Sequence, residues 1–285
     1  MNYREVHLKY TSGLAQILGD EREAQIDVRL LLEAACGTSL SAMLMEPDRE
    51  VSDDEMHRLD AMMERRIKRE PVAYILGEWS FMGLPFAVNR DVLIPRQDTE
   101  TLVEEAMRVT PDKSRILDLC TGSGCILLSL LHYSNASTGL GTDLSAKALR
   151  TADENARRLG LSDRAAFAQG DLFEAVPKDE KFDLVISNPP YIVSDIITTL
   201  APEVRLYEPL TALDGGADGL SFYRRIVQKA PSHLVIGGSL MMEIGYDQAE
   251  AVSDMMKEQG YYDVTVSRDY GGNCRVVHGI RSMHQ

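Results

Sequence analysis

The 285-residue chain contains few of the residues that build disulfide scaffolds and metal centres, with four cysteines and six histidines. Cys36 and Cys274 are isolated, and Cys120 and Cys125 are five positions apart, so the chain has no CxxC pair. The histidines are scattered along the sequence. This distribution argues against a disulfide framework and against a structural zinc site, and we expect no bound metal.

Long apolar runs are also lacking, since none approaches the roughly 20 residues that a membrane span requires. The first 13 residues, MNYREVHLKYTSG, contain no apolar stretch of the kind found in signal peptides. We therefore expect a cytoplasmic protein with no membrane partner.

Basic residues are outnumbered, 30 against 44 acidic ones, which gives a formal net charge of −14. A protein that binds duplex nucleic acid normally presents a cationic face to the phosphates, so we expect no direct nucleic-acid partner. Hydrophobic residues make up 44% of the chain and charged residues 26%, which is typical of a folded globular protein. The length is sufficient for two domains of about 100–200 residues each.

Residues 1–75 are predicted to form a helical bundle. Asp27–Ala35 has a helical pattern that Gly37 is placed to end, and Ser52 with Glu55 forms a capping-box pattern. An apolar stripe at spacings of three and four then follows, before Pro71: Met56, Leu59, Met63 and Ile67. A bundle stabilised by its own core and a domain that docks a partner both fit this pattern.

Residues 76–110 are expected to be a linker with short strands, and residues 111–285 alternate strands with helices. Five strands are expected, at Arg115–Cys120, Thr138–Leu144, Arg164–Gly170, Phe182–Ser187 and Ser239–Ile244. Helices are expected over Cys125–His132 and Ala146–Leu159, the second with Asn155 and Arg157 facing water. Such alternation predicts a parallel sheet with right-handed crossovers.

The C-terminal segment does not continue the alternation of strands and helices. Tyr262–Ser267 and Cys274–Ile280 are predicted strands, and the turn between them, Asp269–Asn273, is hairpin-like. An α/β sheet that ends in an antiparallel hairpin is the arrangement of the class I S-adenosylmethionine-dependent methyltransferase fold, which is Rossmann-like.

A glycine loop follows the first of these strands, in the sequence Asp118-Leu-Cys-Thr-Gly-Ser-Gly124. Gly122 and Gly124 allow positive φ and close approach of a ligand to the backbone, and Asp143 ends the second strand, where an acidic group can bind ribose hydroxyls. The dinucleotide fingerprint requires a third glycine where this chain has Leu127. The loop therefore favours S-adenosylmethionine, which has no phosphates, over a dinucleotide or a turn without a ligand.

The second motif is Asn188-Pro189-Pro190-Tyr191, directly after the fourth strand. An amide or aromatic NH₂ group is a poor nucleophile because its lone pair is delocalised. Two acceptors, the Asn188 side-chain oxygen and the Pro189 carbonyl, are able to orient such a group and stabilise the positive charge that grows on its nitrogen. The prolines fix φ, and the Tyr191 ring is suited to pack against a planar acceptor. We expect Asn188, Pro189 and Tyr191 to be catalytic.

Asp171 and Leu172 follow the third strand. Asp171 is a candidate ligand for the adenine amino group, with Leu172 against the ring. A helix N-cap is an equally good interpretation of this aspartate.

Together these motifs resemble the HemK/PrmC family of protein-(glutamine-N5) methyltransferases that act on class 1 peptide chain release factors. The resemblance extends over nearly the whole chain. It includes Arg69–Gly77, Leu93–Arg96 with Asp98–Glu100, Glu208–Ala212 and Gly215–Gly219. The sequence departs from the family at two positions, with Cys120 where a glycine is usual and Gln97 where a proline is usual.

The resemblance implies that S-adenosylmethionine donates a methyl group to the glutamine amide of the release factor Gly-Gly-Gln motif. It also implies that the helical domain at residues 1–75 helps to hold the release factor. The expected donor site comprises Cys120, Thr121, Gly122, Ser123, Gly124, Asp143, Asp171, Leu172 and Asn188. The expected substrate site comprises Asn188, Pro189, Pro190 and Tyr191.

Three other functions fit parts of the pattern. The first is methylation of adenine N6 or of another nucleobase, since the Asn-Pro-Pro-Tyr motif is shared with such enzymes. An acidic helical domain argues against it, because base flipping calls for basic and aromatic residues. The others are a non-catalytic adaptor with this fold and a nicotinamide dehydrogenase.

Overall fold

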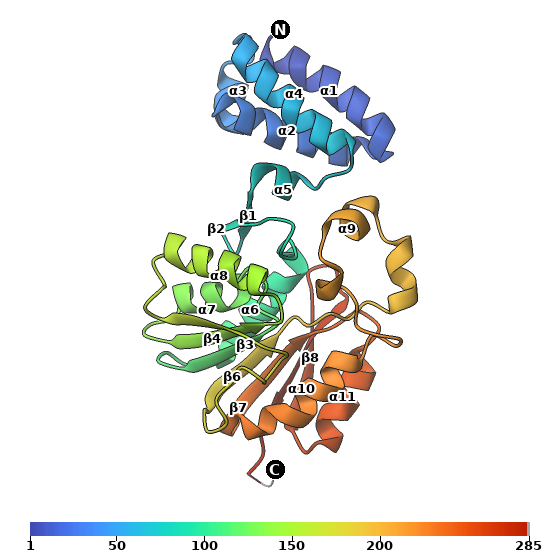
Figure 1. The fold of residues 1–285 in the computed structure, drawn as a ribbon. Coiled ribbons are helices and arrows are strands. Elements are labelled where there is room, and N and C mark those ends of the chain that lie inside the picture. The colour runs from blue at the N-terminus through green and yellow to red at the C-terminus, as the bar shows by residue number, and fades with distance from the viewer. Residues whose placement is uncertain (284–285) are drawn as a thin grey trace. The chain divides into compact units, whose positions relative to one another are not determined.

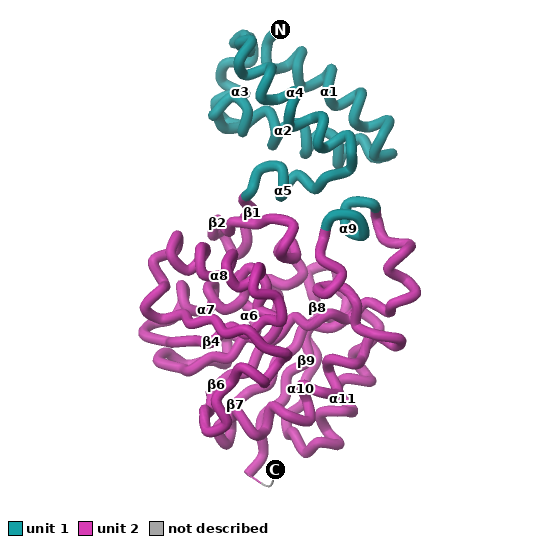
Figure 2. Tube along the Cα trace, viewed as in Figure 1, with its two compact units in different colours: residues 1–77, 202–207 teal, residues 78–201, 208–285 magenta. Residues whose placement is uncertain are grey.

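The computed structural model describes residues 1–283 as two compact units (Figure 2). Unit 1 consists of Met1–Gly77 together with Pro202–Tyr207, and unit 2 consists of Glu78–Ala201 together with the residues from Glu208 onward. Among the described residues, no helix is both long and apolar enough to cross a bilayer.

Unit 1 is built from helices. They are α1 (Tyr3–Leu18), α2 (Glu21–Cys36), α3 (Leu40–Met45), α4 (Asp53–Ile67), α5 (Val72–Leu76) and α9 (Pro202–Tyr207). Gly37 ends α2 in the left-handed conformation, and the predicted capping box of Ser52 and Glu55 begins α4. Buried side chains of α1, α2 and α4, including Leu14, Leu31 and Leu59, give the unit its own core.

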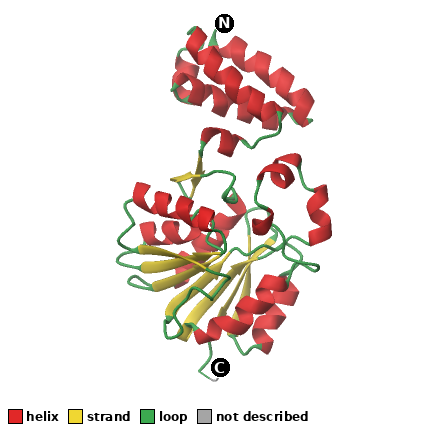
Figure 3. Cartoon of the chain, in the orientation of Figure 1, coloured by secondary structure: helices red, strands yellow, loops and turns green. Residues whose placement is uncertain are grey.

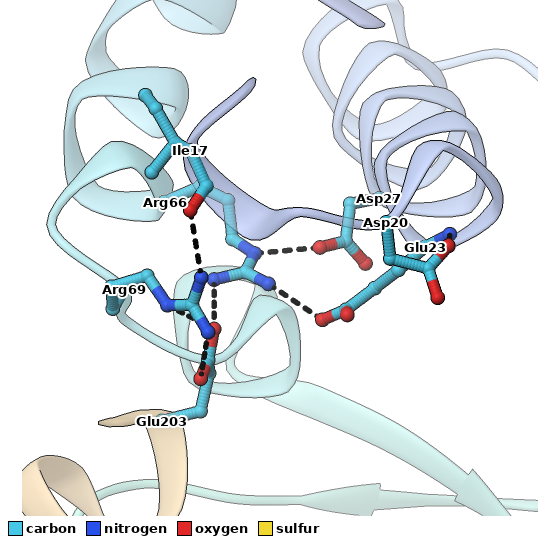
Figure 4. Close-up of polar contacts among 7 residues, drawn as sticks. All are labelled: Ile17, Asp20, Glu23, Asp27, Arg66, Arg69 and Glu203. Atoms are coloured by element: carbon cyan, nitrogen blue, oxygen red, sulfur yellow. Dashed lines mark hydrogen bonds and ion pairs between the residues drawn. The ribbon is translucent and has the colours of Figure 1, made fainter. Parts of the chain in front are cut away.

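The apolar stripe predicted on α4 is wrong at its C-terminal end. Ile67 is 46% exposed, whereas Arg66 is 1% exposed. The Arg66 guanidinium is surrounded by carboxylates, at 2.6 Å from Asp27, 2.9 Å from Glu23 and 2.9 Å from Glu203 of α9 (Figure 4). A buried cation requires such partners, and a pattern of apolar spacing cannot reveal them.

Unit 2 contains a seven-stranded sheet in the order β5-β4-β3-β6-β7-β9-β8 (Figures 1 and 3). Its strands are β3 (Arg115–Leu119), β4 (Thr138–Asp143), β5 (Ala165–Gln169), β6 (Phe182–Ser187), β7 (Leu234–Glu243), β8 (Tyr262–Arg268) and β9 (Cys274–Ile280). Strands β3 to β7 are parallel, and β9 pairs antiparallel with both β7 and β8. The expected fold class, that of the class I methyltransferases, is confirmed.

Helices cover both faces of this sheet. One apolar core includes residues of α6 (Gln97–Val109), α7 (Cys125–Tyr133) and α8 (Ala146–Arg158), and the other includes residues of α10 (Ser221–Lys229) and α11 (Ala249–Glu258) (Figure 1). Residues 78–110, expected as part of a linker, contain the hairpin β1 (Glu78–Phe81) and β2 (Leu84–Ala87) and the helix α6. Leu102 and Val103 of α6 are fully buried, so this segment is part of the core of unit 2.

Residues after β6 are arranged as short helical turns. These are 3-10 helices at Ser194–Thr199 and Leu210–Ala212, on either side of α9, and a third at Ala230–Ser232. The chain therefore leaves unit 2 after Ala201, contributes α9 to unit 1, and re-enters unit 2 at Glu208.

Candidate active site

The candidate site lies at the carboxyl ends of β3 and β6, where the order of the sheet reverses. The chain runs outward from β3 to β4 and β5 and then returns to place β6 on the other side of β3. Ligands bind to open α/β sheets at such a switch point. The glycine loop follows β3 and the Asn188 turn follows β6, so the topology brings the two predicted motifs to one place.

The glycine loop has the backbone conformation that its glycines predict. Gly122 (φ 56°) and Gly124 (φ 79°) are left-handed, and α7 begins directly after Gly124. Cys120 is also left-handed, with φ 58°, at the position where the resembled family usually has glycine. A β-carbon in this conformation is strained, so the departure at Cys120 is tolerated at a conformational cost.

Asp143, at the end of β4, is bound to this loop. Its carboxylate accepts hydrogen bonds from the backbone amides of Gly122 at 2.9 Å and Ser145 at 2.8 Å. Burial raises the pKa of Asp143, and these two hydrogen bonds oppose that shift. Asp143 therefore fixes the loop as well as presenting a carboxylate at the strand end.

Asn155 of α8 was expected to face water, and this expectation is wrong. Its side chain is fully buried. The amide donates to the carbonyls of Ser123 at 2.9 Å and Ala87 at 3.1 Å, and it accepts from the Ala87 amide at 2.7 Å. Asn155 thus ties the glycine loop to β2 through backbone groups, which no side-chain pattern in the sequence indicates.

Asp118 lies beneath the loop. Its side chain is fully buried, and Oδ2 accepts from the Thr121 hydroxyl at 2.6 Å. Burial raises the pKa of Asp118 to about 7, although the hydrogen bond from Thr121 opposes the shift. A second buried carboxylate therefore lies close to the loop, which favours a cationic ligand over an anionic one.

The Asn188 turn contains two acceptors that no group of the described chain binds. Asn188 Nδ2 donates to Oγ1 of Thr99 in α6, at 3.2 Å. Within the described chain, no hydrogen bond ends on Asn188 Oδ1 or on the Pro189 carbonyl. Pro189 and Pro190 are buried, which holds the turn in one conformation.

Packing fixes the residue that follows the two prolines. A β-carbon on Gly219 would lie 2.5 Å from the Tyr191 carbonyl oxygen, so only glycine allows this approach. Gln248 Nε2 donates to that same carbonyl at 3.0 Å, and the Tyr191 hydroxyl donates to Oε1 of Glu243 at 3.3 Å. The Gly215–Gly219 segment thus packs directly against the turn and stabilises it.

A pocket opens beside both motifs. The predicted site residues that line it are Cys120, Gly122, Asp143, Asp171, Leu172, Asn188 and Pro190. Thr121, Ser123, Gly124, Pro189 and Tyr191 are not among its lining residues. The charged residues that line it are Asp91, Asp143, Asp171 and Arg225. An excess of carboxylates suits a cationic ligand and disfavours a pyrophosphate.

Asp171 forms an ion pair with Arg225 of α10, at 2.7 Å. No helix begins at Asp171, since residues 171–176 form turns, so the helix N-cap interpretation is wrong. Leu172 adopts φ 53° and lines the pocket beside it.

The sequence did not single out several contributors to this site. Thr99 and Glu243 contact the Asn188 turn, and Arg96 forms an ion pair with the buried Glu208. The Arg96–Glu208 pair joins two segments that carry the family resemblance, and the neighbouring Leu93 and Pro209 line the pocket. Their places in those segments, and the position of Glu243 at the end of a parallel strand, are the signals that could have identified them. Within residues 1–283 no group of His, Cys, Asp and Glu side chains is arranged to hold a metal ion.

Comparison with known proteins agrees with this geometry. Residues 111–278 match the methyltransferase domain family, and residues 12–77 match the PrmC N-terminal domain. A solved methyltransferase from Pyrococcus furiosus has a similar fold, with 15% identity and a TM-score of 0.55 over 72% of this chain and 92% of that one. The fold and the match over residues 111–278 define an S-adenosylmethionine-dependent methyltransferase.

The relatives narrow the class further. The release factor glutamine methyltransferase of Geobacter sulfurreducens is 43% identical over 272 residues, covering 95% of this chain and 94% of that protein. The protein of the same name from Caulobacter vibrioides is 42% identical, covering 91% of this chain and 90% of its own length. The chain belongs to the release factor glutamine methyltransferase family.

Proposed function

We propose that this enzyme transfers a methyl group from S-adenosylmethionine to the side-chain amide nitrogen, N5, of the glutamine in the Gly-Gly-Gln motif of class 1 release factors. Membership of the family supports the reaction and the acceptor. The observation that carries the chemistry is the pair of unengaged acceptors on the Asn188 turn, Asn188 Oδ1 and the Pro189 carbonyl, beside the pocket. A primary carboxamide has two N–H bonds for two such acceptors.

The pocket suits the donor. Its carboxylates complement a ligand that carries a sulfonium and an ammonium group, and the carboxylate of Asp143 lies where ribose hydroxyls bind in related folds. Asp171 and Leu172 line the part of the pocket proposed for adenine, and residues 120–124 form the loop beside it. When bound there, S-adenosylmethionine supplies an electrophilic methyl group on sulfur.

The residues of the turn prepare the acceptor nitrogen. Asn188 Oδ1 and the Pro189 carbonyl accept its two hydrogens, which directs the lone pair towards the methyl carbon and stabilises the positive charge that forms on nitrogen. The nitrogen–carbon bond forms as the carbon–sulfur bond breaks, and the cationic nitrogen then loses a proton to water. Pro190 lines the pocket, and we expect the Tyr191 ring, whose hydroxyl is bound to Glu243, to pack against the planar acceptor. Positioning of this kind contributes up to about 7–11 kcal/mol.

Unit 1 is proposed to dock the release factor. The first 75 residues contain more acidic than basic side chains, which suits a partner with a basic surface. The net charge of −14 also favours a protein substrate over a nucleic acid, and we propose that the enzyme acts in the cytoplasm without a membrane partner.

The experiment compares methyl transfer to three kinds of acceptor. The purified enzyme is incubated with methyl-labelled S-adenosylmethionine and with a release factor, a DNA duplex or RNA in separate reactions. We expect label only in the release factor, on the Gly-Gly-Gln peptide. Label in DNA or RNA, with an unlabelled release factor, would instead establish a nucleobase N-methyltransferase, whose exocyclic amino group also has two N–H bonds.

A further inference from the structure

The orientation of the Asn188 amide decides whether the turn can work as proposed, because its two arms have opposite hydrogen-bonding character. With Nδ2 towards Thr99 Oγ1, at 3.2 Å, the oxygen Oδ1 remains for the substrate. A rotation of the amide by 180° would instead present an NH₂ group to the substrate's own N–H, which would repel it. Some neighbouring group must therefore favour one orientation.

Thr99 occupies the first turn of α6 and is 2% exposed. Its hydroxyl has one hydrogen and two lone pairs, so it could donate to Asn188 or accept from it. Which of these it does depends on where its own hydrogen goes.

Glu243 is the candidate acceptor for that hydrogen. It ends β7 and is 1% exposed. Oε1 accepts from the Tyr191 hydroxyl, and Oε2 is buried with no hydrogen-bond partner among the described residues. Burial raises the pKa of Glu243 to about 7, and the neighbouring Thr99 hydroxyl is foremost among the groups that lower it. Thr99 and Glu243 are not hydrogen-bonded to each other in the described structure, although each is bound to the Asn188 turn. A small shift that brings the Thr99 hydroxyl to the unpaired Oε2 would satisfy this buried oxygen.

We propose that Thr99 and Glu243 are positioning residues that fix the Asn188 amide with its oxygen towards the substrate. When Glu243 is ionised it takes the hydrogen of the Thr99 hydroxyl, so the Thr99 oxygen can only accept from Asn188. The amide must then direct Nδ2 to Thr99 and Oδ1 to the acceptor nitrogen. The same carboxylate holds the Tyr191 hydroxyl, so one buried group orients both ends of the turn. This role rests on the proposed transfer to a carboxamide nitrogen.

The test compares isosteric variants in α6. T99V removes the hydroxyl and leaves Asn188 without its acceptor, whereas T99S keeps the hydroxyl. T101V is the matched control, because Thr101 is buried in the same helix and its hydroxyl has no hydrogen-bond partner in the described structure. For each variant, kcat on a release factor and the Kd for S-adenosylmethionine are measured at pH 8, where Glu243 is mostly ionised.

We expect T99V to lower kcat by about 10- to 100-fold, as misorientation of a reacting group does, with the donor Kd within about 3-fold of wild type. T99S and T101V should stay within about 3-fold of wild type in kcat. In an N188A background T99V should have no further effect, because the amide that it orients is absent.

Two results would overturn the proposed positioning role of Thr99 and Glu243 while the enzyme remains an active glutamine methyltransferase. One is a T99V variant with wild-type kcat. The other is a T99V cost that is the same in the wild-type and N188A backgrounds, which would indicate a structural role alone. A wild-type enzyme that leaves the release factor glutamine unmethylated would instead overturn the proposed function, and with it the positioning role of Thr99 and Glu243.

Discussion

At the scale of single residues, the site contains three buried carboxylates that differ in how many hydrogen bonds they accept. Asp143 accepts two backbone hydrogen bonds, whereas Asp118 and Glu243 each keep one oxygen without a partner among the described residues. Burial raises the pKa of all three groups. Each of these carboxylates therefore carries its negative charge at a cost in folding free energy, and Asp118 and Glu243 lose that charge as the pH falls below about 7.

Replacing Asp143 should affect donor binding more than chemistry. D143A removes the carboxylate proposed for the ribose and releases the amides of Gly122 and Ser145. We expect calorimetry to show at least about a tenfold weaker Kd for S-adenosylmethionine, equivalent to about 1.4 kcal/mol. D143N keeps one acceptor oxygen and should bind with intermediate affinity. An unchanged Kd in D143A would contradict the ribose assignment.

Replacing Glu243 should change the pH dependence of stability. Its pKa rises from 4.5 to about 7 on folding because of burial, so the folded protein retains a proton that the unfolded chain has released. The residue therefore destabilises the folded state increasingly as pH rises from about 4.5 to about 7. E243Q cannot titrate, and its unfolding free energy relative to wild type should increase by about 2–3 kcal/mol between pH 5 and pH 8.

Urea unfolding of both proteins at the two pH values measures this difference. Asp118 titrates equally in both proteins, so its contribution cancels. A relative stability that does not change with pH would show that Glu243 is ionised throughout this range.

At the scale of elements, the Asn188 turn is stabilised mainly by contacts with the backbone of another segment. The Gly215–Gly219 segment packs directly on Tyr191, and a β-carbon at Gly215 would lie 2.7 Å from the Tyr191 Cα. Ile192 pairs with Asp214 in a parallel bridge. The two segments therefore stabilise each other although more than twenty residues separate them in the chain.

Gly219→Ala should damage the turn. Its new β-carbon would meet the Tyr191 carbonyl at 2.5 Å and Gln248 Nε2 at 2.7 Å, at a residue with φ +71°. We expect a loss of more than about 2 kcal/mol in stability, together with a lower kcat. Gly160→Ala is the control, since it has a similar φ of +68° with nothing near its β-carbon, and should cost about 1 kcal/mol. Equal losses in the two variants, measured by urea unfolding, would contradict the packing argument.

Local patterns were sufficient to predict the strands of the large sheet, the helices α7 and α8, and the two motifs at the switch point, but not α6, α10 or α11. They were not sufficient where a residue's environment comes from distant segments. Asn155 faces the core because backbone groups of Ser123 and Ala87 bind it, and Arg66 is buried because Glu203, 137 residues away, reaches it. Thr99 and Glu243 escaped notice for the same reason, since their partner is the turn that follows another strand.

At the scale of the whole molecule, unit 1 includes six residues, Pro202–Tyr207, that lie in the sequence between the Asn188 turn and the Gly215–Gly219 segment. Glu203 in this segment pairs with Arg66 and, at 2.7 Å, with Arg69 (Figure 4). Ion pairs with the buried Arg66 and the partly buried Arg69 therefore hold α9 to the rest of unit 1. Such pairs contribute little net stability when intact, but they are costly to break from one side.

Removing Arg66 tests this point. R66M leaves Asp27 without its buried cation, whereas Glu203 keeps its pair with Arg69, and we expect R66M to destabilise unit 1 by about 3–5 kcal/mol. R29M is the matched control, because Arg29 forms a more exposed pair with Glu33 within α2, and it should change stability by less than about 1 kcal/mol. Thermal unfolding followed by circular dichroism distinguishes the two. A mild effect of R66M would show that the carboxylates become protonated or hydrated without cost.

The central claim is that the Asn188 turn holds a release factor carboxamide by both hydrogens and presents it to the donor. Mass spectrometry of release factor peptides, sampled over time with wild-type enzyme and with N188A at saturating S-adenosylmethionine, tests it most directly. The account predicts one added methyl group on the glutamine of the Gly-Gly-Gln peptide, formed about 10²–10³-fold more slowly by N188A. Methylation at another residue, or an N188A rate within a few-fold of wild type, would contradict it.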